Sequence, residues 1–177
     1  MQSTMAPKRS EATKRLPEGF LGNLRQVCVV TRDYKKVIAG MLSTGIGPWT
    51  VFTFDPTTCT ALTYRGKPAL YSAKICLARA TGINWEIVQP LDGPTIYDDY
   101  LAANAEGVQH LQFDCNNVPW AEKVATFEAA GFSCIQSGRW LDRLPFAYYG
   151  TESAGTVFEI VDIPEGWQRP EPEETYA

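Results

Sequence analysis

Histidine is the residue whose scarcity narrows the chemistry most, because the 177-residue chain contains only His110. A metal site that needs two or three histidines therefore cannot form within one chain. A Ser-His-Asp hydrolase would have to use His110 itself, and the sequence has no GxSxG motif around a nucleophilic serine. Both kinds of site are disfavoured from the outset.

The cysteines also lack the pattern of a structural site. They are odd in number and far apart, without a CxxC pair: Cys28, Cys59, Cys76, Cys115 and Cys134. This spacing argues against a zinc finger and against a disulfide scaffold. Several lie among apolar residues, where cysteine acts as a small core hydrophobe. We therefore expect a reducing compartment, the cytoplasm.

An excess of positive charge and a long apolar run are missing as well. The net charge is -4 and the pI is about 5.1, so electrostatics gives no support to a nucleic-acid partner. No apolar run approaches the roughly 20 residues of a membrane span, and no signal-peptide core follows Met1. We expect no nucleic-acid partner and no membrane association. With 45% apolar and 20% charged residues, the composition is that of a globular domain.

Strands and helices alternate between two polar ends, residues 1–20 and 164–177, which we predict to be tails. Apolar periodicity and turn residues predict an α+β fold in which the order β-α-β-β-β occurs twice. The first module is expected over 21–104 and the second over 105–163. The predicted helices are 34–43, 97–103 and 119–130, and the predicted strands are 24–31, 49–54, 71–78, 83–89, 108–115, 132–136, 146–150 and 156–161.

A short repeat relates the two predicted modules. The last strand of each contains an aromatic residue followed by Glu-Ile-Val, as Trp85-Glu86-Ile87-Val88 and Phe158-Glu159-Ile160-Val161. The first strands also correspond, since Gln26 and His110 each open an apolar strand that leads into a helix. The repeat therefore aligns Gln26 with His110, and Glu86 with Glu159.

These four residues have a common chemical implication. A glutamate in mid-strand between apolar neighbours is costly to bury without a counter-charge. Neither first strand carries a lysine or arginine at a matched position, so a divalent cation would balance Glu86 and Glu159 together. Gln26 and His110 would then add neutral oxygen and nitrogen ligands. Taken singly, each residue is more often structural, and the prediction depends on the set.

Three segments of the sequence carry a resemblance to a known superfamily: Trp85–Asp114 (WEIVQPLDGPTIYDDYLAANAEGVQHLQFD), GFSCIQSGRW and GTVFEIVD. Through them the sequence resembles the vicinal oxygen chelate superfamily, which includes glyoxalase-like and methylmalonyl-CoA epimerase-like proteins. The resemblance covers about residues 22–163. It implies paired βαβββ modules that form a cupped mixed sheet around a metal held by Gln26, Glu86, His110 and Glu159. This ligand order is similar to that of eukaryotic-type glyoxalases, which implies zinc; manganese, cobalt, nickel and magnesium also suit such ligands.

The resemblance further implies an isomerase, epimerase or lyase that removes a proton beside a metal-bound carbonyl of a small oxygenated substrate. Glu159 is the candidate base, and Glu86 is the second candidate catalytic carboxylate. The strand 49–54 carries no carboxylate, and only Asp55 follows it, which argues against epimerisation with two bases. One histidine and Gln26 argue against the iron site of an extradiol dioxygenase.

Candidate substrate-binding residues are polar or aromatic side chains near the expected site: Gln112, Trp49, Phe52, Arg139, Trp140 and Tyr148. The alternative function is a metal-free protein of the same fold that sequesters a small molecule. By analogy with some relatives we expect a homodimer.

Overall fold

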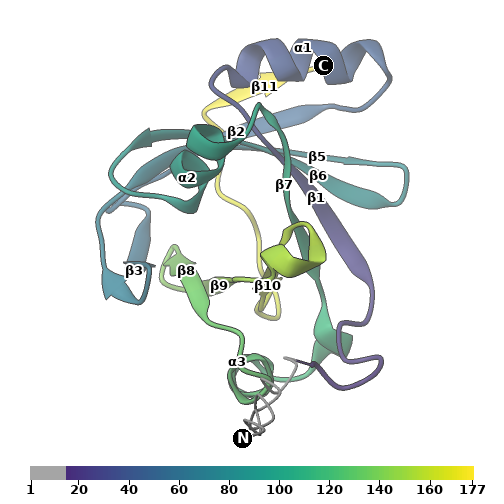
Figure 1. Ribbon diagram of the computed structural model, residues 1–177. Helices are drawn as coiled ribbons and strands as arrows, with labels where there is room; N and C mark the ends of the chain where they lie inside the picture. The colour runs from purple at the N-terminus through teal and green to yellow at the C-terminus, as the bar shows by residue number, and fades with distance from the viewer. Residues whose placement is uncertain (1–14) are drawn as a thin grey trace, which may run out of the picture.

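The computed structural model describes residues 15–177 and contains one curled sheet. Three α-helices are described: α1 (Tyr34–Ser43), α2 (Ile96–Ala103) and α3 (Trp120–Ala129). The helices α1 and α3 lie at opposite ends of the sheet, with α2 between them (Figure 1). The strands are β1 (Leu24–Val30), β2 (Trp49–Phe54), β3 (Cys59–Tyr64), β4 (Lys67–Pro68), β5 (Ser72–Ala80), β6 (Ile83–Asp92), β7 (Gly107–Phe113), β8 (Cys134–Trp140), β9 (Leu144–Tyr149), β10 (Val157–Val161) and β11 (Glu174–Tyr176).

The sheet contains the two predicted βαβββ units side by side. The first unit has the strand order β2-β5-β6-β1, and the second continues as β7-β10-β9-β8. Each first strand pairs in parallel with the last strand of its own unit, and β1 pairs with β7 in antiparallel fashion. The predicted α+β fold with a cupped mixed sheet is therefore confirmed, and its centre is formed by β6, β1, β7 and β10.

Two additions close the cup. The hairpin β3-β4, which the sequence analysis did not predict, leaves the first unit and pairs with β8 at the far end of the second. The residues expected to form a C-terminal tail also return to the sheet, because β11 pairs with β2. Lys74 Nζ lies 2.6 Å from Glu173 Oε2 and reinforces this attachment. Residues 164–177 are therefore a strap fixed at its end.

The N-terminal tail prediction is corrected for the residues that the structure describes. Leu16, Phe20 and Leu21 pack against the cluster of buried residues beneath α3. Most of the predicted tail, including Lys8, Arg9 and Lys14, lies outside the described residues. None of the helices within residues 15–177 is long and apolar enough to cross a membrane.

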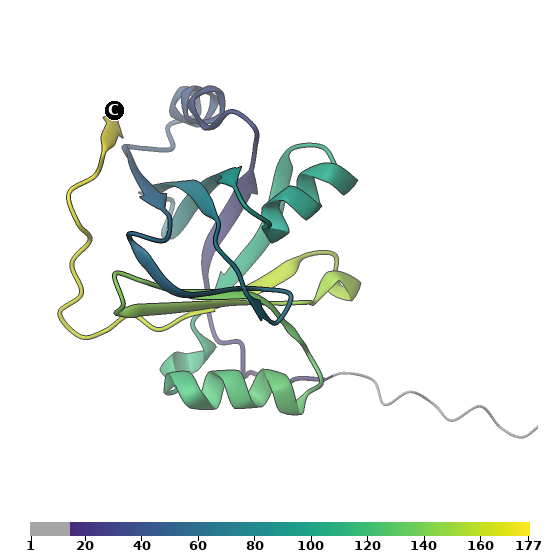
Figure 2. The same ribbon diagram turned by 90° about the vertical axis from the view of Figure 1, so that its left-hand side faces the viewer.

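The helices α1 and α3 form because their apolar stripes cover the outer face of the sheet, whereas α2 packs its buried residues Ile96, Tyr97 and Leu101 against the inner cluster. Asp33 caps α1 by accepting a hydrogen bond from Lys36 N at 3.1 Å, and Ile38 is buried over β2. On the other unit, Phe127 of α3 stacks on Tyr149 with ring centroids 4.1 Å apart. Figure 2 shows α1 and α3 at opposite ends of the molecule, with the strands between them. The inner face of the cup is thus left for a site.

Asp114 joins the end of β7 to the segment that enters β1. Its carboxylate accepts hydrogen bonds from Asn23 N at 3.0 Å, Asn23 Nδ2 at 2.9 Å and Asn116 N at 2.9 Å. Burial would raise the pKa of Asp114, but these hydrogen bonds outweigh it and lower the pKa below its ordinary value. The folded protein therefore stabilises the charged form.

We expect Asp114→Ala to lower the free energy of unfolding by about 1–3 kcal/mol at pH 7, because three part-buried hydrogen bonds to a charged acceptor are lost. The contribution is complete above the unfolded pKa of about 3.9 and disappears as the pH falls through the lower folded pKa. Urea unfolding at pH 7 and near pH 3 measures both effects. Exposed Asp92→Ala is the control. An equal loss at both pH values would contradict the ionic explanation.

Candidate metal and substrate site

The four predicted metal ligands come together on the inner face of the four central strands. Gln26 lies on β1, Glu86 on β6, His110 on β7 and Glu159 on β10. All four are buried, and His110 has no exposed surface. Strand alternation brings them to one face, because each belongs to the inward-pointing set of its strand.

The strand register reproduces the internal repeat. Glu86 lies opposite Cys28, two residues after Gln26, and Glu159 lies opposite Gln112, two residues after His110. The antiparallel pairing of β1 with β7 places Gln26 opposite Gln112, and Cys28 opposite His110. These pairings are the ones that a pseudo-twofold axis between β1 and β7 would produce. The same axis relates Glu86 to Glu159.

His110 lies between the two glutamates. Its Nε2 atom is 3.0 Å from Glu86 Oε2 and 3.5 Å from Glu159 Oε2. Its other ring nitrogen, Nδ1, is 2.6 Å from Gln109 Oε1. Gln112 Nε2 donates to Glu159 Oε2 at 2.8 Å. One imidazole nitrogen therefore faces both carboxylates.

The charge of the imidazole follows from these contacts. Burial lowers the pKa of His110, but hydrogen bonding and charge from Glu159 and Glu86 outweigh burial and raise the pKa to about 9. Without a metal, the structure therefore favours an imidazolium between two carboxylates. A metal would take the place of that proton, since histidine binds metals in its neutral form.

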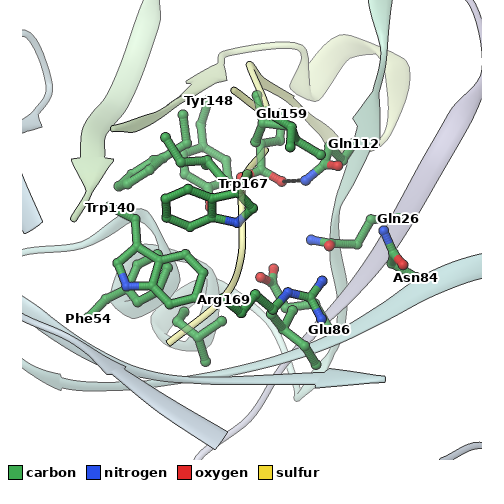
Figure 3. Close-up of a pocket in the computed structure, with 16 residues that line it drawn as sticks. Gln26, Phe54, Asn84, Glu86, Gln112, Trp140, Tyr148, Glu159, Trp167 and Arg169 are labelled. Atoms are coloured by element: carbon green, nitrogen blue, oxygen red, sulfur yellow. Dashed lines mark hydrogen bonds between the residues drawn. The ribbon is translucent and has the colours of Figure 1, made fainter. Parts of the chain in front are cut away.

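The donor set fits a divalent cation. Ligand atoms of Cys28, Glu86 and His110 lie within 4.8 Å of one another. The side-chain amide of Gln26 points into the same space and forms no hydrogen bond among the described residues (Figure 3). Carboxylate, imidazole and amide donors suit zinc and other first-row divalent ions, and thiolate favours zinc. Gln26 and Cys28 are thus two candidates to complete a set that contains both glutamates and His110.

A cavity with about 100 Å³ of free volume opens above this site (Figure 3). Polar groups from Gln26, Asn84, Glu86, Gln112 and Glu159 form one side of it. Apart from Arg169, the rest is apolar or aromatic, with Phe54, Ile75, Leu77, Trp140, Leu144, Phe146, Tyr148, Val161, Ile163 and Trp167. A few polar groups at the base of an apolar cavity are typical of small-molecule sites.

Three predicted substrate-binding residues line this cavity, Gln112, Trp140 and Tyr148. Phe52 lies behind the wall, with its ring centroid 5.2 Å from that of Trp140. Tyr148 accepts a hydrogen bond from the hydroxyl of Tyr97 at 2.9 Å, which leaves its own proton available for another acceptor. Burial raises the pKa of both tyrosines far above the ordinary value, so both stay protonated.

Trp49 and Arg139 do not line the cavity. Trp49 is buried beneath α1 on the outer face of β2, where its Nε1 donates to Ile46 O at 2.8 Å. Arg139 is exposed on β8. Side chains of a strand alternate between faces, so Trp49 and Phe52 point to opposite sides, as do Arg139 and Trp140. The predicted substrate contacts of Trp49 and Arg139 are therefore corrected.

Other residues at the cavity were missed. Trp167 and Arg169 lie in the predicted tail and reach the cavity because the strap passes over it. Nothing in the local sequence indicated this return. Asn84 at the cavity and Cys28 beside the metal ligands could have been found from the sequence. Each lies two residues from a predicted ligand on the same strand, and so faces the same side of the sheet.

Comparison with solved structures identifies the same architecture. A hypothetical protein from Bacillus halodurans superposes with a TM-score of 0.56 at 14% identity, over 83% of this chain and 98% of that one. Methylmalonyl-CoA epimerase from Mycobacterium tuberculosis gives 0.57 at 14% identity, over 86% and 95%. A Streptomyces coelicolor methylmalonyl-CoA epimerase variant in complex with 2-nitronate-propionyl-CoA gives 0.55 at 13% identity, over 84% and 98%. At these identities the similarity establishes the fold.

The sequence comparisons address the family. No curated protein matches the chain. The family model described as the Glyoxalase/Bleomycin resistance protein/Dioxygenase superfamily matches residues 25–144, more than half of the chain. This match and the shared fold confirm the resemblance seen in the sequence. The chain belongs to the glyoxalase/bleomycin resistance protein/dioxygenase superfamily.

Proposed function

We propose that this protein is a metal-dependent isomerase, epimerase or lyase that removes a proton beside a carbonyl of a small oxygenated substrate. The observation that supports it most is the pair of buried glutamates that share one imidazole at the base of an apolar cavity. Buried carboxylates in such a position are typical of catalytic sites. The shared fold of the epimerases adds support at the level of the family.

Gln26, Glu86, His110 and Glu159 would hold the metal, and zinc is our first candidate, with manganese, cobalt, nickel and magnesium as others. When bound, the metal would supply Lewis-acid polarisation of the carbonyl. The apolar walls would exclude water and so strengthen every electrostatic interaction with the substrate. Trp140 and Trp167, whose rings meet at a centroid distance of 5.5 Å, form part of this wall.

Glu159 is our candidate for the base. Gln112 fixes its Oε2 atom, while Oε1 forms no hydrogen bond within the described residues. Glu86, in contrast, is engaged by His110 at 3.0 Å and lies beside Arg169 (Figure 3). Glu159 therefore has an oxygen available to accept a proton, and the protonated Tyr148 could donate to a substrate oxygen.

A metal-free binding protein is the second candidate, and one observation favours it. Arg169 lines the cavity near Glu86; burial lowers the pKa of Arg169 below its ordinary value, and the negative charge of Glu86 offsets only part of that effect. His110 and Arg169 together could balance the two glutamates without a metal. In that case the cavity would sequester a small molecule without transforming it.

Metal analysis of the purified protein separates these functions. We expect about one divalent ion per chain after dialysis against zinc, measured by inductively coupled plasma mass spectrometry. If Gln26 is a ligand, Gln26→Leu should weaken zinc binding about 10-fold or more, and Cys28→Ala should leave zinc affinity unchanged. The reverse result would make Cys28 the ligand in place of Gln26. No bound ion in any variant would contradict the metal-dependent function.

The reaction class needs a separate test. Zinc-loaded protein is incubated in D₂O with hydroxyacetone, dihydroxyacetone, dihydroxyacetone phosphate or pyruvate, and NMR follows exchange of the proton beside the carbonyl. We expect faster exchange than in buffer with zinc alone for at least one of these compounds. If at least one compound binds but none of them exchanges its proton faster than in the control, the sequestering function is favoured.

Two remaining expectations stay proposals. We propose that the chain forms a homodimer and functions in a reducing compartment, where its five free cysteines would stay reduced. Light scattering measures the first, and comparison of Tm with and without reductant tests the second.

A further inference from the structure

A second cavity lies beside the mouth of the first. It has a free volume of about 360 Å³, and four cationic side chains line it, Arg25, Arg79, Lys123 and Arg169. The two cavities are adjacent and share five lining residues, Asn84, Gln112, Val161, Ile163 and Arg169. We name this second cavity the basic groove.

Two of the four cations are already neutralised. Arg25 lies 3.9 Å from Asp114, and buried Lys123 lies 3.3 Å from Asp162 and donates to Val161 O at 2.8 Å. Arg79 and Arg169 form no ion pair or hydrogen bond with any described residue. Among the described residues, the basic groove thus keeps two guanidinium groups without a direct partner, although the charge of Glu86 acts on Arg169.

The positions of these two arginines suggest a use. Arg79 lies on β5 opposite Asn84 of β6, and Arg169 lies on the strap that crosses the mouth. Asn84 and Arg169 also line the buried site, where Figure 3 shows Asn84 beside Gln26 and Arg169 beside Glu86. Guanidinium groups bind carboxylate and phosphate groups through paired hydrogen bonds.

We infer that Arg79 and Arg169 bind an anionic group, a carboxylate or a phosphate, at the outer end of the molecule whose carbonyl end occupies the site of Glu86, His110 and Glu159. The inference rests on the proposed function for the inner end of that molecule. The selected substrates are then small carbonyl compounds that carry a negative charge a few bonds from the reacting carbon. The strap contributes selectivity through Arg169, although it lies outside both βαβββ units.

Matched hydroxamates test the inference. Succinate, glutarate and adipate monohydroxamates combine a metal-binding end with a carboxylate, and neutral alkyl hydroxamates of the same length serve as references. With zinc-loaded protein, calorimetry should show about tenfold or more tighter binding for at least one carboxylated probe. The preference should shrink as NaCl rises from about 20 to 500 mM, because salt screens exposed charges.

In the double variant Arg79→Gln/Arg169→Gln, carboxylated probes should bind no more tightly than neutral probes of the same length, so that the preference is lost. Arg139→Gln is the matched control, since Arg139 is exposed and lies outside both cavities. If neutral and carboxylated probes bind equally well to the wild-type protein, or if the preference survives in the double variant, the inference is overturned.

Binding of inorganic phosphate provides a second test of the anion site that needs no metal. Phosphate should bind the metal-free protein weakly, in the millimolar range, and the double variant should lose this binding. If no hydroxamate binds while phosphate binds through the two arginines, the metal-dependent function fails and the anion site stands. Phosphate binding without any carboxylate preference among hydroxamates that do bind would overturn the assignment to the substrate.

Discussion

His110→Ala is expected to lower the free energy of unfolding of the metal-free protein by about 3–5 kcal/mol. The imidazole is fully buried, and its Nε2 atom faces Glu86 at 3.0 Å and Glu159 at 3.5 Å. Its removal leaves two buried carboxylates with no cation between them. Urea unfolding of protein treated with a chelator measures the loss.

Repeating His110→Ala in a protein without the two buried charges separates charge repulsion from lost packing as the cause of the destabilisation. In a protein that also carries Glu86→Gln and Glu159→Gln, the same His110→Ala change should cost clearly less, because no buried carboxylate remains to be neutralised. A loss below about 1 kcal/mol in the single variant, or an equal loss in both backgrounds, would contradict this account. The zinc-binding assay should also show at least a 100-fold loss of affinity in His110→Ala.

Glu159→Gln should slow proton exchange at the substrate carbon by about 10²–10⁴-fold, the usual contribution of a general base. The amide keeps the shape of the side chain and can still pair with Gln112, so we expect the fold to persist. Zinc affinity should fall by a smaller factor than exchange. The measurement is NMR-detected exchange in D₂O at saturating zinc, with the compound that the wild-type protein exchanges fastest.

Glu86→Gln is the matched control, because the pseudo-twofold axis relates the two glutamates and both lie against His110. We expect it to weaken zinc binding and, once zinc is saturating, to slow exchange less than Glu159→Gln does. Full exchange in Glu159→Gln at unchanged metal content would show that Glu159 is not the base. A larger loss in Glu86→Gln would transfer that role to Glu86.

Local sequence was enough to locate the main elements of the fold. The periodicity predicted α1 over its observed bounds, with Asp33 as its cap, and it predicted β2 over its observed bounds as well. The hairpin β3-β4 was missed because its pairing with β8 joins residues about 75 positions apart, as in Thr63 with Ser137. Short strands of that kind are defined by their partners and carry little signal of their own.

The sequence by itself determined the repeat, the α+β class and the convergence of Gln26, Glu86, His110 and Glu159, because strand alternation and internal duplication are local properties that fix which side chains share a face. Tertiary structure alone decided which aromatic residues reach the cavity. It also returned the C-terminal strap, with Trp167 and Arg169, to the mouth of the cavity. The physical reason is that the strap is held by β11 and by contacts to distant strands, which no periodicity within residues 164–177 encodes.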